Sequence, residues 1–411
     1  MLAKLRPVAT RLVRILGPDP AAVGQSLVAL AISIAATLAA GLTLASAEGR
    51  LSELPGLLLL VPAAIAQRGN VFGAMGSRLG TSIHTGTFRI SARPDTLFGQ
   101  NVIAGIGLSW VAAVWLAAVA KLLAIMFGVA DSMSLLDFVA VSVVGGMIAS
   151  LLVLAITVAL AAGSSRWGWD LDNVTAPLVT ATGDLVTLPA LLIGSAVVAA
   201  NVASEIIGLL SIAVALVILF MVLRSSLPIL HRIVIESLPV LAVASSISLV
   251  AGIVVEKRLQ SFLDEPALLV LVPAYFGMAG ALGGILSSRL GTKIHLGLIT
   301  PSAIPSKVAW EDIRSVVALS LPIFGLVGLF SHLGAVVFGT ASPGVWSMVG
   351  VAMLGGIAAI IVVVAVAYYG TLAAVRSGID PDTAGIPLTN SVLDLVGAFT
   401  LVAAILLLGV A

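Results

Sequence analysis

The chain of 411 residues is 60% hydrophobic and only 9% charged, with a mean hydropathy of +1.20 and a formal net charge of +1. Soluble domains carry about 25% charged residues, so this composition excludes an ordinary water-soluble protein. The sequence has no cysteine, which excludes disulfides, thiolate metal sites and a cysteine nucleophile.

The first segment, residues 1–24, is basic but has no long apolar core followed by a small-residue cleavage site. A secretory signal peptide needs both features. We therefore expect a cytoplasmic N-terminal arm that is retained in the protein.

About eleven apolar runs follow the arm, and a run of about 20 residues is long enough to cross a bilayer as a helix. Only helices or closed barrels satisfy the backbone in lipid, and long unbroken runs argue against barrel strands. The sequence thus predicts an all-α integral membrane protein. The predicted spans are 25–46, 54–75, 99–128, 138–162, 174–199, 204–223, 237–255, 266–287, 314–340, 346–370 and 386–410.

The distribution of lysine and arginine predicts the orientation, because cytoplasmic loops carry an excess of both. With the N-terminus inside, four of these residues are external: Arg50, Lys121, Lys257 and Arg258. Sixteen are then cytoplasmic: Lys4, Arg6, Arg11, Arg14, Arg68, Arg78, Arg89, Arg93, Arg166, Arg224, Arg232, Arg289, Lys293, Lys307, Arg314 and Arg376. We expect a multi-pass protein of the plasma membrane with a cytoplasmic N-terminus and an external C-terminus.

A decapeptide that occurs twice reveals an internal repeat. Residues 77–86 (SRLGTSIHTG) return 211 positions later as 288–297 (SRLGTKIHLG), with eight of ten residues identical. Gly41 matches Gly252 at the same offset, and Asp184 matches Asp394 at an offset of 210. Each repeat therefore contains five predicted spans.

The sixth span, near residues 204–223, has no counterpart in the repeat. Two five-span units joined directly would have opposite orientations, whereas one extra crossing makes them parallel, with a pseudo-twofold axis along the membrane normal. We therefore divide the chain into the arm 1–24, a first repeat 25–203, a connecting helix and cytoplasmic loop 204–235, and a second repeat 236–411.

Each repeat carries one aspartate inside its last span, Asp184 or Asp394, with Thr180 or Asn390 one helical turn before it on the same face. A charged aspartate at a helix centre costs roughly 2.5–3.5 kcal/mol on insertion scales, so two of them need compensation. A hard divalent cation near the axis would supply it, and the lack of cysteine disfavours soft metals. The alternative is that both aspartates are protonated or hydrogen-bonded packing residues.

Further carboxylates stand where the last span of each repeat begins. Asp170 and Asp172 precede the first aspartate, and Asp380 and Asp382 precede the second. Aspartate at the start of a helix is most often an N-cap. A cytoplasmic ring that collects cations is the functional alternative for these two pairs.

The second span of each repeat is expected to break. Pro62 and the glycines and asparagine that follow it, up to Gly73, would expose carbonyls toward a cavity, and Pro273 would do the same in the second repeat. One histidine follows in each decapeptide, His84 or His295, and a lone histidine is more often structural than a metal ligand.

The pattern of Pro62, Gly69-Asn70, Ser77-Arg78-Leu79, Pro177 and Asp184 resembles the MgtE-type transmembrane domain. Its tandem form resembles the solute carrier family 41 divalent cation transporters. The resemblance implies a magnesium pathway between the two repeats, with Mg²⁺ as the transported ion and Asp184 and Asp394 as its coordinating aspartates. Fusion of the repeats would supply the interface that single-repeat members form by homodimerisation. The expected partners are membrane lipid and a divalent cation, with no nucleic acid.

Two other functions stay open. The aspartates would also suit a secondary transporter coupled to protons or sodium, either a cation exchanger or a carrier of an organic substrate. A membrane-embedded metal-dependent enzyme is more remote, because the sequence has no third clustered carboxylate, no nucleophile with an adjacent base and no phosphate-binding glycine loop. We therefore predict a transporter and not an enzyme.

Overall fold

A computed structural model describes residues 20–91, 93–167, 171–199, 201–295, 297–377 and 386–410, and these are almost entirely helical. Ten described helices are long and apolar enough to cross a membrane, and Ala31–Ser46 within α2 is a shorter apolar helix. The prediction of an all-α integral membrane protein is therefore confirmed.

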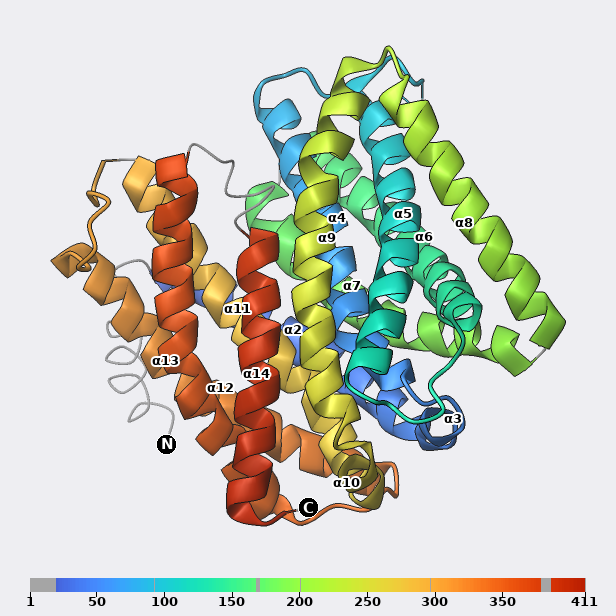
Figure 1. The fold of residues 1–411 in the computed structure, drawn as a ribbon. Coiled ribbons are helices and arrows are strands. Elements are labelled where there is room, and N and C mark those ends of the chain that lie inside the picture. Colours follow the sequence, from blue (N-terminus) through green and yellow to red (C-terminus); the bar gives the residue numbers. More distant parts are fainter. Residues whose placement is uncertain are drawn as a thin grey trace.

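The helix order of the first half recurs in the second half (Figure 1). The first series is α2 (Pro20–Ser46), α3 (Glu48–Glu53), α4 (Leu57–His84), α5 (Leu97–Met126), α6 (Leu135–Trp167) and α7 (Leu171–Ala196). After the short η1 (Val197–Ala199) and α8 (Asn201–Leu223), the second series is α9 (Pro228–Glu256), α10 (Leu259–Asp264), α11 (Ala267–His295), α12 (Lys307–Val337), α13 (Val345–Ser377) and α14 (Ile386–Leu408).

The first long helix of each series packs against the other series as well as its own. Helix α2 contacts α11 and α7, and its counterpart α9 contacts α4 and α14. Two glycines permit this approach: a methyl group on Gly41 would collide with the backbone of Val270, and one on Gly252 with the backbone of Leu59. Gly252 stands 211 positions after Gly41, and Val270 stands 211 positions after Leu59. The two contacts are therefore equivalent, and the two helix series pack against each other symmetrically.

Helix α8 lies at the edge of the bundle against α5 and α6 (Figure 1). Only 22% of its most apolar window is buried, and exposed side chains include Leu209, Leu216 and Phe220. An apolar helix that faces outward in this way is suited to contact with lipid tails.

The expected break in the second span is wrong. Helix α4 runs without interruption from Leu57 to His84 with Pro62 inside it, and α11 does the same around Pro273. Proline removes one backbone hydrogen bond to the residue four positions earlier. Because Pro62 and Pro273 stand in the second turn of their helices, that lost bond falls on a carbonyl of the first turn and the helix continues.

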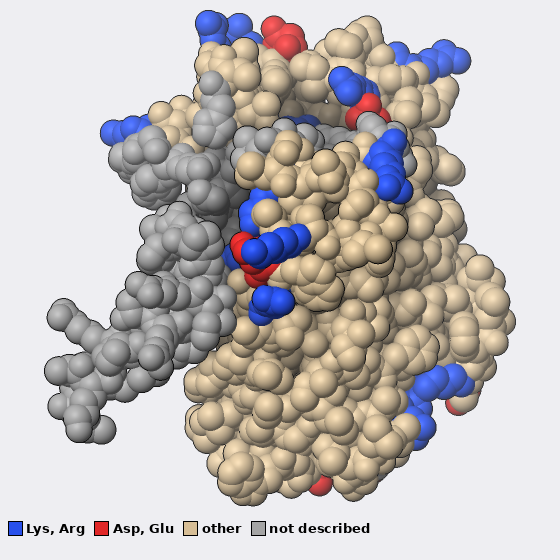
Figure 2. All heavy atoms as spheres, turned by 90° about the vertical axis from the view of Figure 1, so that its left-hand side faces the viewer, with Lys and Arg blue, Asp and Glu red and all other residues tan. Residues whose placement is uncertain are grey.

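The assignment of Arg68 to a cytoplasmic segment is also wrong. Arg68 lies inside α4, in the span Leu57–Ile83, and its side chain is 1% exposed. On the face shown in Figure 2, Lys and Arg gather mainly in the upper half, and a broad uncharged surface lies below them. That uncharged band is what a lipid-facing belt requires.

Candidate cation site between the two helix series

The two intramembrane aspartates occupy equivalent helices. Asp184 is in the middle of α7 and is 3% exposed, and Asp394 is in the middle of α14 and is partly buried. The carboxylate of Asp184 lies beside Gly277 of α11, and α11 packs directly against α14, the helix that carries Asp394. Two acidic side chains that face each other in an apolar interior would attract a cation, because like charges there repel strongly.

Asp394 is held by a hydroxyl that the sequence reasoning missed. Ser248 of α9 is fully buried, and its Oγ donates a 2.8 Å hydrogen bond to Oδ2 of Asp394. The signal was available, because Ser248 stands 211 positions after Thr37, so each repeat carries one hydroxyl at this place.

Thr37 does not repeat the contact of Ser248. Its Oγ1 donates instead to backbone oxygens of its own helix, at 2.9 Å to Ser33 and 3.1 Å to Ile34. Within the described part of the chain, Oδ2 of Asp184 is buried and has no hydrogen-bond partner. One aspartate is therefore fixed by the protein, and the other keeps an oxygen free for a ligand.

A glycine makes room beside the free oxygen. A methyl group on Gly277 of α11 would lie 2.7 Å from Cγ2 of Thr37 and 3.7 Å from Oδ2 of Asp184. Helices α2, α7 and α11 therefore meet at this point, and the carboxylate of Asp184 faces the other helix series. The equivalent residue in the first series is Ala66.

The neighbours one turn before the aspartates differ in exposure. Thr180 is exposed, and its Oγ1 lies 3.7 Å from where a methyl on Gly69 of α4 would sit. Asn390 is partly buried on α14. Both stand four residues before an aspartate, which is the spacing of side chains that share a helix face.

The side chains of the other predicted ligands lie outside the part of the chain that the structure describes. Asp170, Asp380 and Asp382 lie outside the described residues, and so do the side chains of Asp172, His84 and His295. Among the residues that are described, no group of three or more His, Asp or Glu side chains is arranged to hold a metal ion. A cation between Asp184 and Asp394 would therefore also need neutral oxygens or water as ligands.

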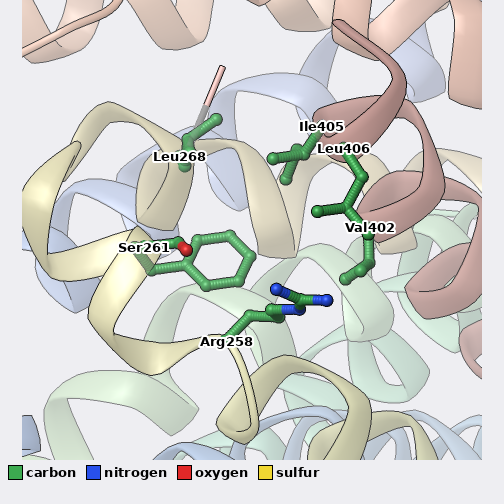
Figure 3. Close-up of a pocket in the computed structure, with 7 residues that line it drawn as sticks. Arg258, Ser261, Leu268, Val402, Ile405 and Leu406 are labelled. Carbon is green, nitrogen blue, oxygen red and sulfur yellow. The ribbon is translucent and has the colours of Figure 1, made fainter. Parts of the chain in front are cut away.

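A small pocket elsewhere does not suit a cation. It lies beside α10, and its one charged side chain is a cation, Arg258, that points into it (Figure 3). Its other lining residues are mostly apolar: Ser261, Phe262, Leu268, Val402, Ile405 and Leu406. Val402 is eight residues beyond Asp394, which is roughly 12 Å along the helix axis.

Comparison with known proteins points to one family. The sequence profile of MgtE, described as a divalent cation transporter, matches residues 61–194 and 272–404, one match in each helix series. These two ranges cover more than half of the chain and include both aspartates.

The similar curated proteins are solute carriers. Solute carrier family 41 member 2 of Xenopus laevis is 26% identical over 373 residues, which are 84% of this chain and 64% of that protein. Member 3 of Mus musculus is 24% identical over 365 residues, with 84% and 74% covered. Member 2 of Homo sapiens is 27% identical over 264 residues, with 61% and 44% covered. The chain thus spans less than two thirds of the length of the Xenopus and human proteins.

Among solved structures, the crystal structure of the eukaryotic MATE transporter AtDTX14 aligns over 93% of this chain and 96% of its own, at 12% identity. The TM-score is 0.28, which is too low to indicate a common fold.

Proposed function

The chain belongs to the MgtE divalent cation transporter family, and from that premise we propose that it conducts Mg²⁺ through a pathway between its two helix series. Members of this family are transporters, which sets the membrane-enzyme alternative aside. The observation that carries the proposal is the buried Oδ2 of Asp184, which has no hydrogen-bond partner among the described residues and faces Gly277 of the other helix series.

In this proposal Asp184 and Asp394 hold the ion between them. Mg²⁺ prefers six oxygen ligands and releases its water reluctantly, so the ion stays largely hydrated and each carboxylate binds it directly or through water. Oδ2 of Asp184, which accepts no hydrogen bond from any described residue, supports this role. Selectivity for divalent ions then follows from two negative charges in an apolar surrounding, and cavity size against the hydrated ion sets the rest.

We assign the flanking polar residues to the approach of the ion. Thr180 and Asn390 offer neutral oxygens one turn toward the proposed cytoplasmic side. The pairs Asp170/Asp172 and Asp380/Asp382 stand at the start of the same helices, where they either cap the helix or collect cations.

The membrane potential supplies the energy for uptake. Moving two charges inward across 100 mV, inside negative, releases about 4.6 kcal/mol at about 2.3 kcal/mol per charge. That corresponds to more than three decades of concentration ratio, so a channel-like pathway needs no other coupling. We place the protein in the plasma membrane with its N-terminus in the cytoplasm, and the two fused repeats take the place of a homodimer.

The test is Mg²⁺ flux into proteoliposomes that contain the full chain. Asp184→Asn and Asp394→Asn should each lower the flux strongly, and the double variant should abolish it. Asp264→Asn is the matched control, because Asp264 is an exposed aspartate on α10. Mg²⁺ flux that survives in the double variant would reject the site. Stimulation by an imposed sodium or proton gradient would identify a coupled exchanger instead of a channel.

A further inference from the structure

The proposed cation pathway does not use Arg68, a charged residue that is buried inside the bundle. Its side chain is 1% exposed, inside a helix that crosses the membrane. A guanidinium keeps its proton in proteins, so Arg68 carries a permanent positive charge. An unneutralised charge in the membrane interior is energetically costly, and such residues are commonly functional.

The side chain of Arg68, on α4, begins beside α7 and ends beside α6. A methyl group on Gly183 of α7 would lie 3.3 Å from Cβ of Arg68, and one on Gly146 of α6 would lie 2.7 Å from its Nη2. The guanidinium therefore lies beside α6 at Gly146. Arg68 takes part in none of the ion pairs between described residues.

Four buried polar atoms around this side chain have no hydrogen-bond partner among the described residues. They are Nε of Arg68, Nε2 of Gln67, Oγ of Ser109 and Oγ of Ser150. Each of these residues is at most 1% exposed. Within the described part of the chain, the one hydrogen bond of these side chains joins Nη1 of Arg68 to Oε1 of Gln67, at 2.7 Å. All four unpartnered atoms can donate a hydrogen bond, and the two nitrogens can only donate.

The four residues lie on three neighbouring helices, α4, α5 and α6, which pack against one another (Figure 1). Ser150 is one turn after Gly146 on α6. Ser109 is one turn before Ala113 on α5, and Cβ of Ala113 is 3.5 Å from the methyl position on Gly146. Residues four apart share a helix face, so both hydroxyls lie about one turn, roughly 5.4 Å, from the guanidinium level.

A second contact fixes the level of Ser109. A methyl group on Gly105 would lie 3.3 Å from the ring of Phe72, which is one turn after Arg68 on α4. Ser109 stands midway between Gly105 and Ala113 along α5. Ser109 is therefore level with the part of α4 that carries Arg68, about one turn from the guanidinium.

The second helix series has no such cluster. Met278 and Ala279 replace Gln67 and Arg68, and Ile360 replaces Ser150. Gly356, the equivalent of Gly146, faces the ring of Phe324 instead of a guanidinium. Three of the four residues are thus replaced by apolar ones in the second series, and Ser320, the counterpart of Ser109, donates a 2.8 Å hydrogen bond to the backbone oxygen of Val317 in its own helix.

We propose that Gln67, Arg68, Ser109 and Ser150 form a buried site for one monovalent inorganic anion of the size of chloride. Water could accept the same hydrogen bonds, but it would leave the positive charge of Arg68 unneutralised. One halide ion satisfies the donors and neutralises the charge together. A multivalent anion would replace a buried positive charge by a buried negative one, which is no gain.

The test is chloride binding to the purified full chain, measured with radioactive chloride by equilibrium dialysis against a gluconate buffer. We expect one saturable chloride per chain, and a higher unfolding temperature in chloride than in gluconate at equal ionic strength. Arg68→Met should lower chloride affinity at least tenfold and remove the difference in unfolding temperature. Arg224→Met is the matched control, because Arg224 is an exposed arginine stacked on Phe220.

The serines keep the proposal testable if Arg68→Met does not fold. The Ser109→Ala/Ser150→Ala double variant should fold and bind chloride several-fold more weakly. Wild-type protein without saturable chloride binding, or unchanged binding in both variants, would overturn the site. The double variant Asp184→Asn/Asp394→Asn should keep chloride binding whether or not it loses Mg²⁺ flux, so this proposal and the proposed function fail separately.

Discussion

The hydroxyl of Ser248 on α9 donates a 2.8 Å hydrogen bond to the carboxylate of Asp394 on α14. In the other helix series, Thr37 donates to its own helix and leaves Oδ2 of Asp184 without a partner among the described residues. Two aspartates that are equivalent in sequence are thus held differently, and the two halves of a site between them are not interchangeable.

Ser248→Ala should weaken Mg²⁺ binding more than Thr37→Ala. A hydrogen bond to a charged group contributes about 1.5–3 kcal/mol, so we expect an apparent affinity lower by about ten- to a hundredfold when Ser248 is removed. Thr37→Ala serves as the control, since its hydroxyl bonds only within α2. The measurement is the Mg²⁺ dependence of flux into proteoliposomes. Equal losses in both variants would mean that the Ser248 contact does not orient Asp394.

Gly277→Ala should reduce transport while the protein still folds. The added methyl would lie 2.7 Å from Thr37 and 3.7 Å from Oδ2 of Asp184, so it crowds α2 and the carboxylate together. Gly73→Ala is the matched control, because a methyl there meets nothing within 4 Å. Flux per folded protein, with folding followed by size-exclusion chromatography, should fall for the first variant and not for the second. A normal flux in Gly277→Ala would show that this space is not needed by the ion.

Gly41→Ala and Gly252→Ala should each destabilise the whole bundle. In both cases the new methyl would collide with a backbone, of Val270 or Leu59, and a backbone yields less readily than a side chain. Overpacking costs typically 1–3 kcal/mol, and this clash is at the severe end. Gly284→Ala on α11 should instead keep or raise stability, because its methyl meets nothing within 4 Å and alanine favours helix. Thermal unfolding in detergent compares the three variants. Similar unfolding temperatures would contradict the inferred close packing of the two helix series at these glycines.

Glu256→Gln should loosen the contact between α9 and α4. Oε1 of Glu256 accepts a 2.7 Å hydrogen bond from the backbone N–H of Gly56, the N-cap residue of α4. A carboxylate at a helix N-terminus stabilises through this bond and through the helix dipole, together by about 1–2 kcal/mol. Glu53→Gln, at an exposed side chain, is the control. The unfolding temperature should fall only for Glu256→Gln, and no difference between the two would argue against the cap.

Sequence alone predicted the helices, the repeat and the two central aspartates. Crossing a bilayer needs long apolar runs, and a carboxylate inside such a run stands out because burying it is costly. The offset between Asp184 and Asp394 is a property of the sequence and needs no coordinates. The same reasoning failed at Pro62 and Arg68, because a helix tolerates proline in its second turn and a span can bury a charge.

Only the tertiary structure decided which side chains meet. The contacts of α2 with α11 and of α9 with α4 join residues far apart in the sequence, such as Gly41 with Val270 and Gly252 with Leu59, and no local pattern specifies them. Ser248 and Thr37 are equivalent in sequence, yet one bonds an aspartate and the other its own helix. The hydroxyl rotates to whichever acceptor the packed neighbours place within reach, so the partner is a property of the fold and not of the residue.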